Sequence, residues 1–198
     1  MSFVVMMNGH PACLKSTISK ALAKELNVDL IQTNMFGGTI TETGYSSLDL
    51  RDARYQKAFL KAEELFMERK SFIFDGTFTK KKWREQLYSL CKYYDVGKVI
   101  ILRCFSSDVK VVEQRFFQRA LGSESAEKDS VYLKNYLRDV PLDEPPFTDK
   151  EVKKGLASII VIDSAKIQIV NEFGNGELTN HIKLNLLKVL EGLEVIKC

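Results

Sequence analysis

Short hydrophobic runs alternate along this chain with longer segments in which hydrophobic residues recur every three or four positions. The run at residues 3–8 shows no polar alternation, which is typical of a strand covered on both faces. A tight turn that begins with Gly9 follows it, and residues 15–26 then carry hydrophobic side chains at helical spacing. The first unit of the chain is therefore predicted to be a strand, a turn and a helix.

The same alternation continues to the end of the chain. Further strands are predicted at 29–33, 71–74, 98–104, 157–163 and 167–170, and further helices at 48–69, 82–94, 106–121, 131–138 and 178–193, with a loop at 35–47 and a turn at 173–176. Ser106 or Ser107 is expected to cap the helix at 106–121. Strands that alternate with helices predict an α/β fold, a parallel sheet with helices on both faces, in a single domain over residues 1–198.

Composition and charge exclude several classes of protein. The chain has 198 residues, of which 45% are hydrophobic and 28% are charged, and this is typical of a compact globular domain. Its 29 basic and 26 acidic residues give a net charge of +3, so a nucleic acid is a possible partner but not a favoured one. Four scattered cysteines and two histidines argue against a zinc site and favour reduced thiols. No hydrophobic run reaches membrane length and no targeting signal is evident, so we expect a cytoplasmic protein without a membrane partner.

The turn after the first strand carries the strongest chemical signal. It matches the phosphate-binding motif G-x-x-x-x-G-K-[ST], except that Leu14 stands where the motif has its second glycine. In this motif backbone N–H groups surround phosphates, a lysine reaches the β and γ oxygens, and a hydroxyl binds Mg²⁺. Lys15 and Ser16 hold the required positions, whereas a side chain at a glycine position with positive φ costs about 1 kcal/mol or more. The candidate nucleotide-binding residues are Gly9, His10, Pro11, Ala12, Cys13, Leu14, Lys15, Ser16 and Thr17. The alternative is an ordinary strand-to-helix turn with a solvated lysine.

The second chemical feature is the carboxylate of Asp75, which ends the hydrophobic strand at 71–74 and precedes Gly76. An aspartate at this place can hold Mg²⁺ through its waters or accept a proton from an attacking hydroxyl. The alternative is a turn-forming Asp-Gly pair without a chemical role. Ligands of parallel sheets bind at the carboxyl ends of the strands, so the nearby motif at 9–17 favours the functional interpretation.

Arg115 and Arg119 form the third feature, because they lie one helical turn apart and precede a polar stretch at 122–130. Guanidinium groups on a closing lid can stabilise the charge of a phosphoryl group in transfer and exclude water. The alternative is a solvated helix face. The place of the pair after the fourth predicted strand favours a small helical lid over about residues 115–140.

A resemblance to a known family rests on the order and spacing of these segments. They are Gly9-His10-Pro11 with Lys15-Ser16-Thr17, the helix with Arg54-Tyr55, Asp75-Gly76-Thr77-Phe78, Arg84, and Arg115 with Arg119. Over roughly residues 3–140 the chain is similar to the P-loop kinases of the polynucleotide-kinase, zeta-toxin and chloramphenicol-phosphotransferase type. The resemblance implies a P-loop NTPase fold and a kinase that uses ATP and Mg²⁺ to phosphorylate a hydroxyl group of a small molecule or nucleotide.

The resemblance also implies roles for individual residues. The implied catalytic residues are Lys15, Asp75, Arg115 and Arg119; the implied metal ligands are Ser16 and Asp75; and the implied substrate-binding residues are Asn34, Thr77 and Arg84. For Arg84 the resemblance allows two roles, orienting the acceptor or bracing the site.

The sequence departs from this family at Asn34, because many relatives carry a catalytic aspartate after the second strand. An asparagine can hold an acceptor hydroxyl but cannot act as a base, so Asp75 or water would take that role. Leu14 is the second departure. Both leave open an alternative function, a catalytically degenerate ATP-binding protein that acts as a sensor or binding module. The acceptor, the preferred nucleotide base and the oligomeric state are not specified by the sequence.

Overall fold

The computed structural model describes residues 2–36, 48–97, 99–121, 155, 157–174 and 176–195. Within these residues, six strands form one sheet in the order β2-β3-β1-β4-β5-β6. The first five strands pair in parallel, and β6 runs antiparallel to β5. The strands are β1 (Val4–Asn8), β2 (Asp29–Gln32), β3 (Phe72–Asp75), β4 (Val99–Phe105), β5 (Ala157–Asp163) and β6 (Gln168–Phe173). The predicted α/β fold is confirmed.

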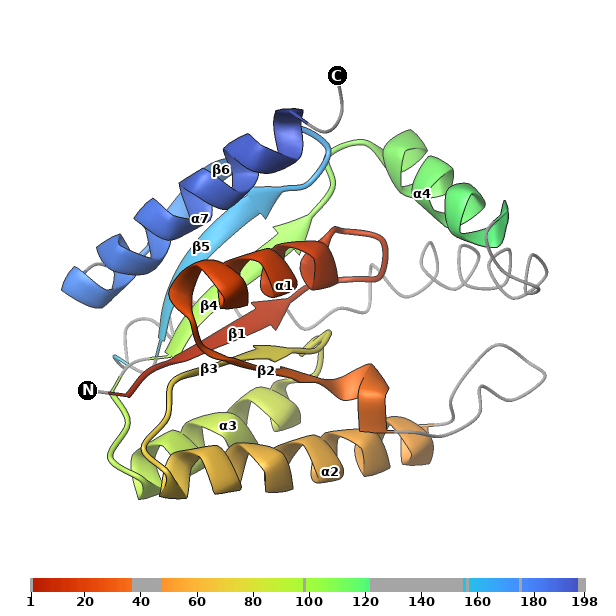
Figure 1. The fold of residues 1–198 in the computed structure, drawn as a ribbon. Helices are drawn as coiled ribbons and strands as arrows, with labels where there is room; N and C mark the ends of the chain where they lie inside the picture. Colours follow the sequence, from red (N-terminus) through yellow and green to blue (C-terminus); the bar gives the residue numbers. More distant parts are fainter. Residues whose placement is uncertain are drawn as a thin grey trace.

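Helices cover both faces of the sheet, as the sequence predicted (Figure 1). The helices are α1 (Lys15–Leu26), α2 (Leu48–Met67), α3 (Lys81–Tyr93), α4 (Val109–Leu121) and α7 (Glu177–Val195), with a short 3-10 helix, η1, at Thr33–Phe36. α1 and α7 lie on one face and α2 and α3 on the other, whereas α4 lies beyond the carboxyl ends of the strands. None of the described helices combines the length and hydrophobicity that a membrane span requires. The predicted helix at 131–138 and the predicted lid beyond residue 121 lie outside the described residues.

The core has two layers because alternate residues of a strand face opposite sides of the sheet. In β1, Val4 and Met6 belong to the layer under α2 and α3, whereas Val5 and Met7 belong to the layer under α1 and α7. All five residues of β1 are buried, which explains the unbroken hydrophobic run in the sequence. The turn after β1 therefore leaves the sheet near its middle, between β3 and β4.

The predicted cap of the helix at 106–121 is wrong. The helix α4 begins at Val109, and the carboxylate oxygen Oδ1 of Asp108 accepts a hydrogen bond from the N–H of Lys110 at 2.8 Å. The Ser107 hydroxyl instead donates to Oδ2 of Asp163, at the end of β5, over 2.6 Å. Ser107 therefore serves a tertiary contact, and Asp108 caps the helix in its place.

Candidate functional site

The β1–α1 loop, residues 9–14, starts with a glycine that no other residue can replace without strain. Gly9 has a φ of 129° and donates its N–H to the carbonyl of Thr77 at 3.0 Å. A Cβ atom on Gly9 would lie 2.0 Å from the carbonyl oxygen of Cys104. Gly9 thus allows the loop to leave the sheet in contact with the ends of both neighbouring strands.

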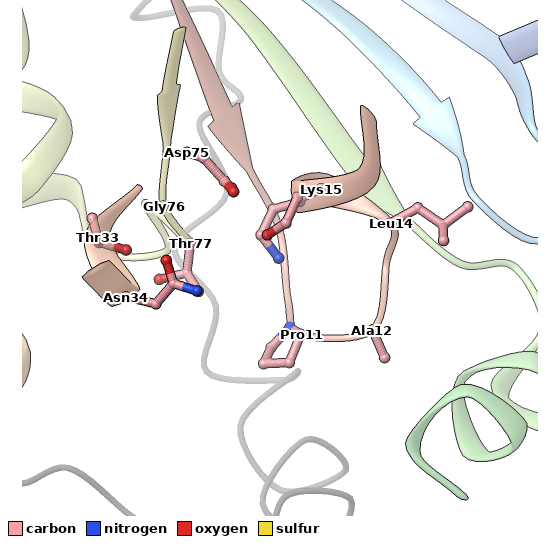
Figure 2. Close-up of a pocket in the computed structure, with 10 residues that line it drawn as sticks. Pro11, Ala12, Leu14, Lys15, Thr33, Asn34, Asp75, Gly76 and Thr77 are labelled. Carbon is pink, nitrogen blue, oxygen red and sulfur yellow. The ribbon is translucent and has the colours of Figure 1, made fainter. Parts of the chain in front are cut away.

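Leu14, the residue that departs from the phosphate-binding motif, takes the conformation that a glycine would take there. It lies at the N-cap of α1 with φ 59° and ψ 9°, in the left-handed region. This conformation costs a leucine about 1 kcal/mol. The Leu14 side chain packs on the hydrophobic layer under α1 and α7, and Figure 2 shows it directed away from the cavity. The substitution therefore leaves the space inside the loop open, and the hydrophobic contact offsets part of the strain.

A cavity of about 210 Å³ opens between the β1–α1 loop and the ends of β2 and β3 (Figure 2). Its lining residues are Pro11, Ala12, Leu14, Lys15, Ser16, Thr33, Asn34, Asp75, Gly76 and Thr77. The structure thus brings together residues that lie far apart in the sequence, from the β1–α1 loop, from η1 and from the end of β3. Thr33 is a lining residue that the sequence analysis did not select.

Among the described residues that line the cavity, Lys15 is the cation. Its side chain is largely enclosed, since the residue is only 8% exposed, and its ammonium donates a hydrogen bond to the carbonyl of His10 at 2.5 Å. The ammonium and the N-terminus of α1 both present positive potential to the cavity. This part of the cavity is suited to an anion with several oxygens.

Asp75 faces Lys15 across the cavity (Figure 2). The carboxyl group is buried, and its Oδ2 accepts a hydrogen bond from the side-chain amide of Gln32 at 3.0 Å. Gln32 is the direct neighbour of Asp75 in the pairing of β2 with β3. Gln32, which the sequence analysis did not select, therefore fixes the orientation of the carboxylate.

Two buried polar side chains outside the cavity hold the loop that follows β3. The amide of Asn8 donates to the carbonyls of Thr77 and Phe78 at 3.1 and 2.9 Å. The hydroxyl of Tyr55 accepts the N–H of Phe78 at 2.8 Å and lies 3.4 Å from Oγ1 of Thr77. Burial raises the pKa of Tyr55 to about 12, so the phenol stays protonated. Neither Asn8 nor Tyr55 was predicted as a site residue, although both position Thr77.

Two of the arginines predicted as site residues, Arg84 and Arg115, do not line the cavity. Arg84 is 1% exposed and donates through NH1 to the carbonyls of Phe78, at 2.8 Å, and Thr79, at 3.4 Å. These contacts brace the loop that follows β3, and the role of Arg84 in binding the acceptor stays a prediction. Arg115 donates to the backbone of the β1–α1 loop. The side chain of Arg119, near the end of α4, lies outside the described residues.

The other candidate nucleotide-binding residues surround the cavity without lining it. The His10 carbonyl holds the Lys15 ammonium. Cys13 is buried in the layer under α1 and α7, and Thr17 is exposed in the first turn of α1. The nucleotide-binding roles of these residues stay predictions.

The buried carboxylate of Asp163 holds the end of β5 against the segment that precedes α4. Asp163, at the end of β5, accepts hydrogen bonds from the N–H of Ser107 at 3.1 Å, the hydroxyl of Ser107 at 2.6 Å and the N–H of Ala165 at 3.0 Å. Burial raises the pKa of this carboxyl, but the hydrogen bonds outweigh burial and hold the pKa below its ordinary value of 3.8. Asp163 thereby ties the end of β5 to the segment that starts α4.

We expect Asp163→Asn to lower the free energy of unfolding at neutral pH by about 1–3 kcal/mol, because a neutral amide replaces a charged acceptor. Since the folded pKa is lowered, the ionised carboxylate stabilises the fold above pH 3.8, and this contribution disappears as the pH falls through the folded pKa. Urea unfolding of both proteins, in steps from neutral to about pH 3, should show the difference narrowing in acid. A difference that stays constant over this range contradicts the assigned role.

The donor groups of the cavity fit a nucleoside triphosphate with Mg²⁺. Ser16 supplies a hydroxyl and Asp75 a carboxylate, and Mg²⁺ is commonly held by one or two such oxygens together with waters and phosphate oxygens. In the described part of the chain, no three His, Cys, Asp or Glu side chains gather into a group that would enclose a metal ion by protein ligands alone. The Lys15 ammonium and the N-terminus of α1 are suited to the phosphates.

Solved structures with the same fold include several kinases. A protein from Chloroflexus aurantiacus, provisionally assigned as a kinase, is 19% identical with a TM-score of 0.63, and the match covers 98% of this chain and 97% of that protein. A gluconokinase from Sinorhizobium meliloti is 14% identical with a TM-score of 0.54, covering 99% of this chain and 98% of the other. A sugar kinase from Janibacter sp. is 14% identical with a TM-score of 0.61, covering 96% of each chain. At these identities the likeness shows a shared fold.

The family of the chain is assigned by comparison of its sequence with known families. No curated protein is significantly similar to the chain in sequence. The sequence pattern of the AAA domain family, however, matches residues 4–140, which is more than half of the chain. The match includes the β1–α1 loop, η1 and the end of β3, the three segments that form the cavity. The chain therefore belongs to the AAA domain family.

Proposed function

We propose that the protein is an ATP-dependent kinase that transfers the γ-phosphoryl group to a hydroxyl of a small molecule or nucleotide. The observation that carries this proposal is a single cavity lined by Lys15, Ser16 and Asp75 at the N-terminus of α1. A cation, a hydroxyl and a carboxylate in this arrangement are the groups that phosphoryl transfer requires. The fold shared with a gluconokinase and a sugar kinase supports the same reaction class.

The β1–α1 loop would bind the triphosphate. Lys15 would neutralise the β and γ oxygens, and the first N–H groups of α1 would donate to them. Ser16 would hold Mg²⁺ and Asp75 would hold it through waters, and the ion supplies charge neutralisation to the phosphates when bound. The enclosed Lys15 side chain would keep its charge close to the reacting group, where water screens it least.

The acceptor would lie on the side of the cavity formed by η1 and the end of β3. Thr33, Asn34 and Thr77 offer neutral hydrogen-bonding groups there. A bond would form between the acceptor oxygen and the γ-phosphorus while the bond to the bridging oxygen breaks, and ADP leaves with that electron pair. Among the described residues that line the cavity, Asp75 is the only carboxylate, so it would receive the proton of the acceptor hydroxyl.

Asp75→Asn tests the catalytic part of this proposal. We expect kcat to fall about 100-fold, because an amide can still accept the hydrogen bond from Gln32 but cannot take a proton. The affinity for ATP in the absence of Mg²⁺ should stay unchanged. Asp29→Asn is the matched control, since Asp29 is exposed at the opposite end of β2. Transfer from radiolabelled ATP to a panel of sugars, polyols, nucleosides and a 5′-hydroxyl oligonucleotide supplies the measurement.

A second candidate function is ATP binding without transfer, as in a sensor or binding module. The observation that favours it is Asn34, because η1, among the described residues that line the cavity, contributes Thr33 and Asn34 but no carboxylate. Under this alternative, the wild-type protein binds ATP with Mg²⁺ and phosphorylates none of the acceptors. Under the kinase proposal, at least one class of acceptor is phosphorylated and Asp75→Asn lowers that rate.

A further inference from the structure

Hydrogen bonds from Arg115 join α4 to two other parts of the protein. Its NH1 donates to the carbonyl of Ala12 at 3.0 Å and to the hydroxyl of Ser164 at 3.0 Å, and its NH2 donates to the carbonyl of Ser164 at 2.5 Å. Ala12 belongs to the β1–α1 loop, and Ser164 directly follows β5. One guanidinium group therefore connects the loop at the cavity to the end of the sheet.

The side chain of Ala12 also packs against α4. Ala12, Val112 and Phe116 form a small cluster of buried residues. Val112, Arg115 and Phe116 share one face of α4, because they are three and four positions apart. Figure 2 shows α4 beside Ala12, on the other side of the loop from Asp75 and Asn34. Ala12 has a φ of 62°, an unfavourable value for alanine that persists only where the surroundings restrain it.

The hydrogen bond to Ala12 also determines where the next N–H points. The carbonyl of Ala12 and the N–H of Cys13 belong to one peptide group, and none of the described peptide bonds is cis, so the two groups point in opposite directions. Arg115 holds the carbonyl toward α4, so the Cys13 N–H is turned to the cavity side of the loop. A loop binds an anion through N–H groups turned inward in this way.

Ser164, the second residue that the Arg115 guanidinium contacts, is fixed to the sheet. Ser164 is fully buried, and its N–H donates to the carbonyl of Phe105 at 2.8 Å. The neighbouring Asp163 is held by Ser107 and Ala165. Ser164 is thus a rigid support, and a displacement of Arg115 would move the loop rather than the sheet.

We propose that Arg115 is a positioning residue for triphosphate binding, which fixes the orientation of the Ala12–Cys13 peptide group. The inference rests on the proposed function, since it assigns this task within the same site. It differs from the role implied by the family resemblance, in which Arg115 belongs to a lid and meets the phosphoryl group in transfer. Arg115 acts through the backbone of the loop and does not line the cavity.

Binding of two ligands by Arg115→Met tests the inference. Methionine keeps an apolar stem of similar length but has no donor for the hydrogen bonds to Ala12 and Ser164. We expect the affinities for ATP and for inorganic tripolyphosphate, each with Mg²⁺, to fall by the same factor of about 10 or more. Arg115→Lys should recover part of the loss, because an ammonium can still reach one acceptor. Lys110→Met, an exposed site on the same helix, is the matched control and should bind both ligands as the wild type does.

Two results of this titration overturn the inference. A loss for ATP with none for tripolyphosphate means that Arg115 contacts the nucleoside instead of shaping the loop. Unchanged affinities for both, with a lowered kcat for transfer, mean that Arg115 acts on the phosphoryl group, as a lid residue would.

NMR relaxation of the free protein separates this inference from the proposed function, because it needs no ligand. We expect the backbone order parameters of Ala12, Cys13 and Leu14 in Arg115→Met to fall toward about 0.6, the range of flexible backbone. Unchanged order parameters overturn the inference. If the wild type binds neither ATP nor tripolyphosphate, the proposed function fails, and the relaxation data alone decide whether Arg115 positions the loop.

Discussion

Lys15→Met is expected to lower kcat/KM for phosphoryl transfer by about 1000-fold and the affinity for ATP with Mg²⁺ by about 100-fold. The Lys15 ammonium lies at the cavity and is the cation nearest in sequence to the N-terminus of α1. Methionine keeps the apolar stem of this largely enclosed side chain, so the loss isolates the charge. Calorimetric titration gives the affinity, and steady-state kinetics give the transfer efficiency.

Lys20→Met is the matched control for this prediction. Lys20 lies on the same helix, α1, but is exposed to solvent. Its substitution should leave both the affinity for ATP and the transfer rate unchanged. If Lys15→Met binds ATP with Mg²⁺ as tightly as the wild type, the β1–α1 loop does not bind phosphate, and both candidate functions are wrong.

Gly9→Ala is expected to lower the free energy of unfolding by about 4 kcal/mol. The added Cβ would lie 2.0 Å from the carbonyl oxygen of Cys104, and this oxygen belongs to β4 near the middle of the sheet. A backbone atom of a buried strand cannot move aside as a flexible side chain can. The φ of 129° adds strain, because side chains other than that of glycine disfavour this conformation. Urea unfolding followed by circular dichroism measures the loss.

Gly192→Ala supplies the contrast. Gly192 lies in α7, and beyond its own helix a Cβ atom there would meet none of the described atoms within 4 Å. Alanine favours a helix over glycine, so this variant should gain about 0.5–1 kcal/mol. If Gly9→Ala loses less than about 1 kcal/mol, the close approach of Gly9 to β4 does not determine where the loop lies.

The order of strands and helices was predictable because buried strands and amphipathic helices leave different periodicities in the sequence. The unbroken run of β1 and the spaced hydrophobic residues of α1 are examples. The start of α4 was not predictable, because Ser107 bonds to Asp163, 56 positions later in the chain. The antiparallel direction of β6 is explained by its short connection to β5, since a parallel crossover needs about a dozen residues or more.

The candidate site was predictable for residues whose position relative to the carboxyl end of a strand already places them at the cavity. Lys15 and Asp75 are such residues, and both line the cavity. The roles of the arginines could not be predicted in the same way, because the sequence identifies a cationic side chain but not the hydrogen-bond acceptor that it contacts. Arg84 and Arg115 both reach backbone carbonyls. Gln32 was missed because its pairing with Asp75 depends on the order of the strands in the sheet. The catalytic role of Arg119 stays a prediction.

The central position of β1 has a consequence for synthesis on the ribosome. β1 emerges first, yet both of its neighbours, β3 and β4, are made later, and the second of them ends at Phe105. At about 5–20 residues per second, several seconds pass before both partners exist. Gly9 donates its N–H to the carbonyl of Thr77, and Asp75, Gly76 and Thr77 line the cavity, so a nascent chain without these residues has no formed cavity. The proposed binding of a nucleotide would therefore stabilise the finished fold but could not guide the first stages of cotranslational folding.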